Sequence, residues 1–245
     1  MASVRLLPFA DLDGPANMAA DEVLLWQAAE SGRAAMRFYT WKEPTLSLGY
    51  FQPAAEHARN PRLAALPWVR RATGGSALVH HHELTYALAL PAGTPWQSRE
   101  PSWLCRMHEM IALALSRLGA VTQAVACGRE RRLGPILCFL HQTPGDLLAS
   151  GHKVVGSAQR KQRGALLQHG GILLATSELT PELPGLRELT GFQHSPQTVA
   201  RAIADTFSQM TGWTLTPEDW TETEQTQRRQ RETERYRNPA WNEKR

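Results

Sequence analysis

Apolar residues recur at the spacing of an amphipathic helix in three stretches of the chain. This spacing predicts helices over residues 17–31, 102–118 and 196–209. Asn17 and Ser195 stand where the first and the last of these helices would need an N-cap. Gly32 and Gly119 follow the first two helices, as is typical of residues that end a helix.

Shorter apolar runs, some alternating with polar residues, predict strands between and after these helices. The longest run has three histidines, where the strand could bend, and two later runs form a hairpin across Ser150-Gly151. The predicted strands are residues 36–41, 45–49, 68–71, 77–90, 135–140, 146–149, 153–158 and 165–175. Strands and helices do not alternate regularly. We therefore expect an α+β fold of mixed, largely antiparallel β-sheets flanked by helices, not a doubly wound parallel sheet.

The length of the chain, 245 residues, suits one large domain, with or without a small appendage. Near residue 221 the sequence becomes rich in Thr, Gln, Glu and Arg. A final polar helix is expected to begin near Thr216-Pro217. We therefore expect a main domain over residues 1–220 and a polar helical tail over residues 221–245 that packs on the same domain.

The composition is that of a globular protein, with 42% hydrophobic residues and a mean hydropathy of −0.38. No apolar run approaches the ~20 residues that span a bilayer, and the N-terminus does not resemble a signal peptide. The three cysteines are odd in number and widely spaced, which argues against a disulfide framework or a zinc knuckle. We expect a cytoplasmic protein with no membrane partner.

The net charge of +4 would suit nucleic acid or an acidic protein as partner. The basic residues are not interleaved with aromatic residues in a nucleic-acid-binding motif, so no nucleic-acid partner is expected. In the tail they are mixed with glutamates, which is typical of a solvated helix face.

Several well-known catalytic motifs are absent from the sequence: the P-loop, the dinucleotide-binding G-x-G-x-x-G, the G-x-S-x-G elbow and the zinc motif H-E-x-x-H. The run His80-His81-His82-Glu83 raises the question of a metal site. Neighbouring residues of a strand point to opposite faces, so only His80 and His82 could converge. We therefore expect no metal site.

Two segments bring glycines next to charged residues. In the first, Arg71 precedes Thr73-Gly74-Gly75, and paired glycines let backbone N–H groups approach an anionic or thioester oxygen closely. In the second, Lys153 precedes Gly156-Ser157-Ala158-Gln159. Each segment alone is typical of an ordinary turn or a solvent-facing strand, whereas the two together favour a site.

Together the two segments resemble the lipoate–protein ligase and octanoyltransferase family. Residues 70–86 resemble that family's R-R-x-T-G-G-x-x-V-x-H-x-x-E-L-T-Y signature. Residues 151–159 resemble its G-x-K-[IV]-x-G-S-A-Q segment, and a Q-H-G strand follows. The resemblance also covers residues 17–22, 46–52, 235–236 and 241–242, in the family's order. Ser76, His81-His82 and Gly171 depart from residues common in relatives, at positions that bear on acceptor recognition.

The resemblance implies a biotin/lipoate ligase-like catalytic domain. It also implies an acyl or lipoyl group in an apolar tunnel, for which Leu78, Leu88 and Leu173 are candidate linings. The acceptor would be a lysine of a lipoyl domain of a 2-oxoacid dehydrogenase E2 subunit or of the glycine-cleavage H protein. The implied substrate-binding residues are Arg71, Thr73, Gly74, Gly75, His80, Gly156, Ser157, Ala158, Gln159, His169 and Gly170.

Two chemistries occur in the family, and Cys138 favours one of them. Cys138-Phe139 resembles the Cys-Phe of the cysteine-dependent octanoyltransferases, which take octanoate from acyl carrier protein through an enzyme thioester and need no cofactor. The alternatives are an ATP- and Mg-dependent lipoate–protein ligase and an amidotransferase that moves octanoyl from H protein to E2 subunits. A non-catalytic acyl- or lipoyl-domain-binding protein is the alternative of another class.

The expected catalytic residues are Cys138 as nucleophile and Lys153 as its partner. An ordinary thiol is only slightly ionised at pH 7, and a lysine ammonium nearby would stabilise the thiolate. Backbone amides near Gly74-Gly75 and Gly156-Ser157 would hold the oxyanion of the reaction. In the second half-reaction, a neutral Lys153 could take the proton of the acceptor lysine.

Overall fold

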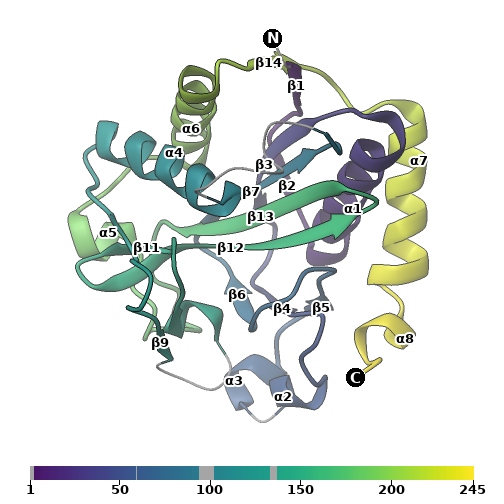
Figure 1. The fold of residues 1–245 in the computed structure, drawn as a ribbon. Coiled ribbons are helices and arrows are strands. Elements are labelled where there is room, and N and C mark those ends of the chain that lie inside the picture. The colour runs from purple at the N-terminus through teal and green to yellow at the C-terminus, as the bar shows by residue number, and fades with distance from the viewer. Residues whose placement is uncertain (1–2, 59, 94–101, 133–136) are drawn as a thin grey trace.

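A mixed β-sheet forms the centre of the protein (Figure 1). The computed structural model describes residues 3–58, 60–93, 102–132 and 137–245. β2 (Ala10–Leu12) pairs with β3, and the other strands follow one another across the sheet. They are, in order, β14 (Thr214–Pro217), β1 (Ser3–Leu6), β3 (Ala35–Trp41), β7 (Glu83–Leu90), β13 (Ala165–Leu173), β12 (His152–Gln162), β11 (Leu147–Ala149) and β8 (Gln123–Ala124).

The central and largest part of this sheet is antiparallel. β3, β7, β13, β12, β11 and β8 pair in antiparallel fashion, and only β14, β1, β2 and β3 form parallel pairs at one end. The expected α+β class with largely antiparallel sheets is therefore confirmed.

Helices cover both faces of the sheet (Figure 1). α4 (Trp103–Arg117) and α6 (Pro196–Thr211) pack their apolar faces on one side of it. α1 (Gly14–Ser31) packs on the other side, beside α7 (Glu222–Arg231). In the part of the chain that the structure describes, no helix is both long and apolar enough to cross a membrane.

A smaller sheet lies at the lower edge of the main one in Figure 1. β4 (Thr45–Leu48) stands between β5 (Trp68–Arg70) and β6 (Leu78–His80), and the short helices α2 (Ala55–Ala58) and α3 (Pro61–Ala64) lie in the connection from β4 to β5. A separate apolar core supports this layer and includes Leu46, Leu48, Leu137 and Phe139.

The remaining short elements complete the edges of the fold. They are β9 (Arg131–Arg132), which pairs with β10 (His141–Gln142), the 3₁₀ turn Cys138–Leu140, α5 (Leu186–Thr190), the π-helical turn Glu232–Tyr236 and α8 (Pro239–Asn242).

The predicted helices exist, but only some of their N-terminal residues were predicted correctly. Ser102 and Ser195 accept hydrogen bonds from the backbone as N-caps of α4 and α6. The cap of α1 is Asp13, because its carboxylate accepts the N–H of Ala16 at 3.0 Å. The predicted cap Asn17 is wrong: it lies within α1, and its side-chain amide donates to the backbone outside that helix.

Three predicted segments differ from the structure. The run 77–90 bends so strongly at its histidines that β6 and β7 belong to different sheets. The strand predicted over residues 135–140 is wrong for 138–140, which form a 3₁₀ turn, and residues 135–136 lie outside the described chain. Thr216-Pro217 ends strand β14, paired with β1 from the opposite end of the sequence, and α7 begins only at Glu222.

Candidate active site

A pocket opens between the main sheet and the small sheet, with about 520 Å³ of empty space including its mouth. Gly156 and Gly171 are partners in the β12–β13 ladder and leave part of the pocket floor without side chains. The pocket is lined by Met18, Tyr39, Trp41, Ser47, Arg71, Gly75, Ser76, Leu78, His80, Thr85, Cys138, Phe139, Gly156, Ser157, Ala158, His169, Gly170 and Gly171. The absence of side chains at Gly156 and Gly171 therefore leaves space for a ligand.

The turn after β5 forms one wall of this pocket. Gly75 has a φ of +90°, which favours glycine. The guanidinium of Arg71 donates to the carbonyls of Gly74 at 2.8 Å, Ser76 at 2.7 Å and Ser47 at 3.1 Å, and so fixes the turn. Burial lowers the pKa of Arg71, and the nearby Cys138 acts in the opposite direction. Arg71 is thus a buried cation whose charge acts on the thiol.

Cys138 lies in the same pocket at the start of the 3₁₀ turn. Its backbone N–H donates to the carbonyl of Ala77 at 2.7 Å, which attaches the turn to the segment after Gly75. The thiol sulfur lies 4.0 Å from the amine of Lys153. The other cysteines lie elsewhere, Cys105 on α4 and Cys127 exposed at the surface. Cys138 is therefore the cysteine placed beside both a cation and a cavity.

Lys153 reaches the thiol from β12 and is almost entirely buried. Its amine pairs with the carboxylate of Asp146 at 2.7 Å and donates to the carbonyl of His141 at 3.0 Å. The end of the side chain lies directly over Gly156, where an added Cβ would stand 2.5 Å from Cε. Gly156 is thus required for the path of this lysine.

A chain of hydrogen bonds behind the floor holds this part of β12. The side-chain N–H of Gln168 donates to the Tyr86 hydroxyl, and Ser157 lies between Tyr86 at 2.7 Å and His108 at 2.6 Å. His108 uses its other ring nitrogen to donate to the carbonyl of Gly145, next to Asp146. Burial lowers the pKa of His108 and raises that of Tyr86. Both groups are therefore neutral links at pH 7.

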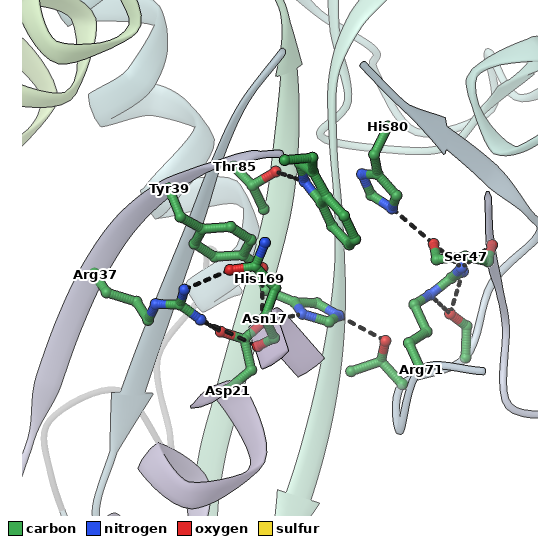
Figure 2. Close-up of polar contacts among 12 residues, drawn as sticks. Asn17, Asp21, Arg37, Tyr39, Ser47, Arg71, His80, Thr85 and His169 are labelled. Atoms are coloured by element: carbon green, nitrogen blue, oxygen red, sulfur yellow. Dashed lines mark hydrogen bonds and ion pairs between the residues drawn. The ribbon is translucent and has the colours of Figure 1, made fainter. Parts of the chain in front are cut away.

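A second buried network surrounds His169 (Figure 2). Its Nε2 lies 2.7 Å from the hydroxyl of Thr73, and its Nδ1 lies 2.8 Å from the carboxylate of Asp21. Arg37 pairs with the same carboxylate at 2.8 Å, and Tyr39 donates to it. Burial and the Asp21 charge raise the pKa of Tyr39 well above its usual value. The network ties α1 to β13 and to the turn that carries Thr73.

His80 is the centre of a third set of contacts, of which Figure 2 shows the one to Ser47. Its Nδ1 lies 2.6 Å from the carboxylate of Glu83, and its Nε2 lies 2.8 Å from the hydroxyl of Ser47. The indole of Trp41 stacks on the imidazole with ring centroids 3.7 Å apart. The indole N–H of Trp41 in turn donates to the hydroxyl of Thr85 at 2.9 Å. The imidazole of His80 is thus held by hydrogen bonds at its edge and by the fixed indole on its face.

Of the predicted site residues, some line the pocket and others support it. Those in the lining are Cys138, Arg71, Gly75, His80, Gly156, Ser157, Ala158, His169 and Gly170. Thr73, Gly74, Lys153 and Gln159 lie outside the lining formed by the described residues: Thr73 contacts His169, Lys153 contacts Cys138, and Gln159 donates to Gln168.

Of the tunnel residues suggested by the sequence, only Leu78 lines the pocket. Leu88 lies in the core beneath α4 and α6, and Leu173 in the core of the small sheet. The sequence reasoning also missed Ser47, Glu83, His108 and Asp146. Their partners are distant in sequence or have no recognisable spacing. Asp21, Ser47 and Glu83 lie in stretches that resemble the family, and that signal could have identified them.

The histidine run adopts a different arrangement from the predicted one. His80 turns into the pocket, while the rings of His81 and His82 stack at 3.6 Å on the surface near Glu178. The prediction that only His80 and His82 could converge is wrong, because His81 and His82 lie in the bend between two strands and do not follow the alternation of one strand.

Sequence comparison identifies relatives across most of the chain. Residues 13–224 match the family model of the lipoyl protein ligase A/B catalytic domain. Octanoyltransferase LipM of Brevibacillus brevis is 38% identical over 172 residues, which make up 64% of this chain and 61% of that relative. Octanoyltransferase LipM of Symbiobacterium thermophilum is 31% identical over an alignment that covers 97% of each chain. The chain thus matches about three fifths of the first relative's length and nearly all of the second's.

Comparison of structures agrees on the fold. A crystal structure of lipoate-protein ligase A bound with ATP superposes with a TM-score of 0.81 and 22% identity over 99% of each chain. The expected lipoate ligase-like catalytic fold is therefore confirmed. The family model covers most of the residues, including both glycine-bearing segments and Cys138. The chain belongs to the lipoyl protein ligase A/B catalytic domain family.

Proposed function

We propose that this protein is an octanoyltransferase that takes octanoate from acyl carrier protein, holds it as a thioester on Cys138 and passes it to a lysine of a lipoyl domain or of the H protein. The observation that carries the proposal is the Cys138 thiol in the pocket, 4.0 Å from the Lys153 amine. The relatives named as octanoyltransferases support the transfer of an octanoyl group. No cofactor is required for this route.

In the first half-reaction, the thiolate of Cys138 attacks the carbonyl carbon of the carrier thioester. A new C–S bond forms, the carrier's C–S bond breaks, and the carrier sulfur leaves with the electron pair and takes the proton that Cys138 gave up. The buried charges of Lys153 and Arg71 stabilise the thiolate. Gly75-Ser76 and Gly156-Ser157 lie in the pocket wall, where their backbone amides would act on the oxyanion.

The acyl chain needs an apolar surface as well as the reactive thiol. Each methylene that leaves water contributes about 0.8 kcal/mol, or roughly 5 kcal/mol for an octanoyl chain. Met18, Trp41, Leu78 and Phe139 offer such a surface in the pocket. Burial of the octanoyl chain would thus contribute to binding of the donor while Cys138 reacts with the donor's carbonyl group.

The proposal is tested by incubation of the protein with octanoyl acyl carrier protein, followed by intact-mass analysis. We expect an octanoyl adduct that hydroxylamine removes and that maps to Cys138. C138S should form no such thioester, whereas C127S, at an exposed site outside the pocket, should form it normally. Full transfer activity in C138A would show that the thioester route is wrong.

A panel of donors separates this proposal from the other chemistries of the family. Pyrophosphate release on addition of lipoate, ATP and Mg would indicate a ligase. Acylation by octanoyl H protein but not by octanoyl acyl carrier protein would indicate an amidotransferase. Binding of all donors without turnover would indicate a binding protein. We expect adduct formation with octanoyl acyl carrier protein and no pyrophosphate.

A further inference from the structure

The second half-reaction of the proposed function needs a base. The acceptor lysine arrives as an ammonium ion, since with a pKa near 10.4 only about one lysine in 2,500 is neutral at pH 7. An ammonium nitrogen has no lone pair and cannot attack a thioester. A side chain in the pocket that removes a proton from it would make the amine nucleophilic.

Lys153 is poorly placed to be this base. Its amine forms a buried ion pair with Asp146 at 2.7 Å, and both side chains are 3% exposed. It also donates to the carbonyl of His141 at 3.0 Å. In this ion pair the lysine is an ammonium, which has no lone pair to accept a proton. Lys153 suits the stabilisation of a thiolate, and the base must be another group.

Ser47 and His80 share the pocket with Cys138 and form a directed chain that ends at Glu83. Glu83 is an acceptor, so the 2.6 Å contact places the proton of His80 on Nδ1. Nε2 is then a lone-pair acceptor, and it receives the hydroxyl proton of Ser47 at 2.8 Å. This is the arrangement of a hydroxyl, an imidazole and a carboxylate that serves proton transfer on unrelated folds.

The side chains around Ser47, His80 and Glu83 favour the transfer of a proton to His80. The carboxylate of Glu83 is fully buried, and its second oxygen has no hydrogen-bond partner among the described residues. The oxygen that faces His80 also accepts the hydroxyl proton of Thr85 at 2.6 Å, and this neutral donor leaves the negative charge of the carboxylate to the imidazole. Trp41 stacks on the ring at 3.7 Å, and Arg71 donates to the Ser47 hydroxyl oxygen at 3.1 Å. The oxygen of Ser47 keeps one lone pair for an incoming ammonium.

The similar set around His169 is less suited to this task. Its carboxylate, Asp21, already pairs with Arg37 at 2.8 Å and accepts from Tyr39 at 2.8 Å. Its hydroxyl belongs to Thr73, which lies outside the pocket lining that the described residues form. A carboxylate shared with an arginine stabilises an imidazolium less than one whose other partner is the neutral hydroxyl of Thr85.

From this geometry we infer that Ser47, His80 and Glu83 form the proton relay of the aminolysis step. The acceptor ammonium gives one proton to Oγ of Ser47 while Ser47 passes its own to Nε2 of His80. The neutral amine attacks the carbonyl carbon, and a C–N bond forms. The C–S bond then breaks, and its electron pair leaves on Sγ of Cys138, which takes the second proton from the nitrogen. His80 returns its proton to solvent when the product leaves.

The test measures the two half-reactions separately in single turnovers of H80Q, E83Q and S47A. Acylation of Cys138 by octanoyl acyl carrier protein should slow far less than transfer in each variant, because the relay acts on the acceptor. Transfer from the isolated acyl-enzyme to the acceptor domain should slow about 100-fold or more in H80Q, the range of general-base catalysis, and less in E83Q and S47A. H82Q is the matched control, because His82 is exposed outside the pocket, and it should behave like the wild type.

Hydroxylamine distinguishes a lost base from a damaged pocket. It is neutral at pH 7 and needs no deprotonation, so it should cleave the acyl-enzyme of H80Q as fast as that of the wild type. Equal slowing of acylation, hydroxylamine cleavage and transfer in H80Q would overturn the relay and leave His80 a structural role. Wild-type transfer rates in both H80Q and S47A would overturn it too. A wild-type protein that forms no adduct at all would instead contradict the proposed function on which this inference rests.

Discussion

The carboxylate of Asp146 lies 2.7 Å from the amine of Lys153, while the Cys138 sulfur lies 4.0 Å from the same amine. The lysine is thus balanced by one buried anion and is close enough to stabilise a second, the thiolate. Thr143 holds the carboxylate in place by donating its backbone N–H and its hydroxyl to the oxygen that faces the lysine. Asp146 therefore positions Lys153 without touching the reacting atoms.

Removal of this carboxylate should destabilise the fold. In D146N, the Lys153 ammonium would stay buried without its counter-ion, and such a loss typically lowers the free energy of unfolding by about 3–5 kcal/mol. The double variant D146N/K153M removes both charges and should recover most of this loss. Urea denaturation of the wild type, the two single variants and the double variant gives the coupling energy. Additive effects of the two substitutions would show that the pair contributes no interaction.

A methyl group on Gly156 should affect reactivity more than stability. In G156A the new Cβ would stand 2.5 Å from Cε and 2.9 Å from Nζ of Lys153, so the amine must move away from its position beside Cys138. We expect the rate of Cys138 acylation to fall at least about tenfold, while the free energy of unfolding falls by about 1–3 kcal/mol. G74A is the reference for stability, because its Cβ meets nothing closer than 3.9 Å. Normal acylation by G156A would contradict the assigned path of the lysine.

The arginine of the glycine turn should not be replaceable by lysine. In R71K, one ammonium cannot reach the carbonyls of Ser47, Gly74 and Ser76 together, and each buried acceptor left without a donor costs about 1–3 kcal/mol. We expect a lower urea midpoint and slow acylation of Cys138. R160K is the control, because Arg160 donates one hydrogen bond, to the carbonyl of Ala72. Equal effects of R71K and R160K would contradict a special role of the Arg71 guanidinium.

Stability should fall on acidification partly because of His108. Burial lowers the pKa of His108 below its ordinary value of 6.5, although its bond to Gly145 opposes the shift. Between these two pKa values the unfolded chain binds a proton that the native protein does not. The contribution is therefore complete above pH 6.5 and is lost as the pH falls through the native value. Melting temperatures between pH 8 and pH 5 should fall more steeply for the wild type than for H108Q; parallel curves would contradict this.

The fold was largely predictable because its main elements carry local signals. The apolar faces of α4 and α6 and the serine cap of α6 are visible in the sequence, as is the hairpin across Ser150-Gly151. The errors fall where distant contacts decide the structure. Thr216-Pro217 forms a strand because β1 pairs with it, and Cys138 lies in a turn because its N–H meets the carbonyl of Ala77. Such contacts have no counterpart in local propensity.

The site was predictable to a lesser depth. The glycines beside Arg71 and Lys153 indicated the two segments that form the pocket wall, and the resemblance to the family indicated Cys138. The side chains that pair with these residues in the structure could not be identified from the sequence. Asp146 reads as an ordinary strand-end acid and Ser47 as an ordinary strand serine until the fold places them beside Lys153 and His80. Sequence spacing reports which residues are near in the chain, not which are near in space.

Trp241 and Asn242 hold the strand that leads into the site. The backbone N–H of Arg70 donates to the Asn242 side chain at 2.9 Å, its guanidinium donates to the Asn242 carbonyl at 2.8 Å, and the Trp241 indole donates to the Arg70 carbonyl at 2.8 Å. Synthesis runs from the N-terminus, so Arg70 waits for these partners until residue 242 has left the ribosome. The strand that leads into the glycine turn thus gains these three hydrogen bonds only after residue 242 has been synthesised. The thiol of Cys138 and the amine of Lys153 are therefore synthesised before the partners that fix Arg70 next to their pocket.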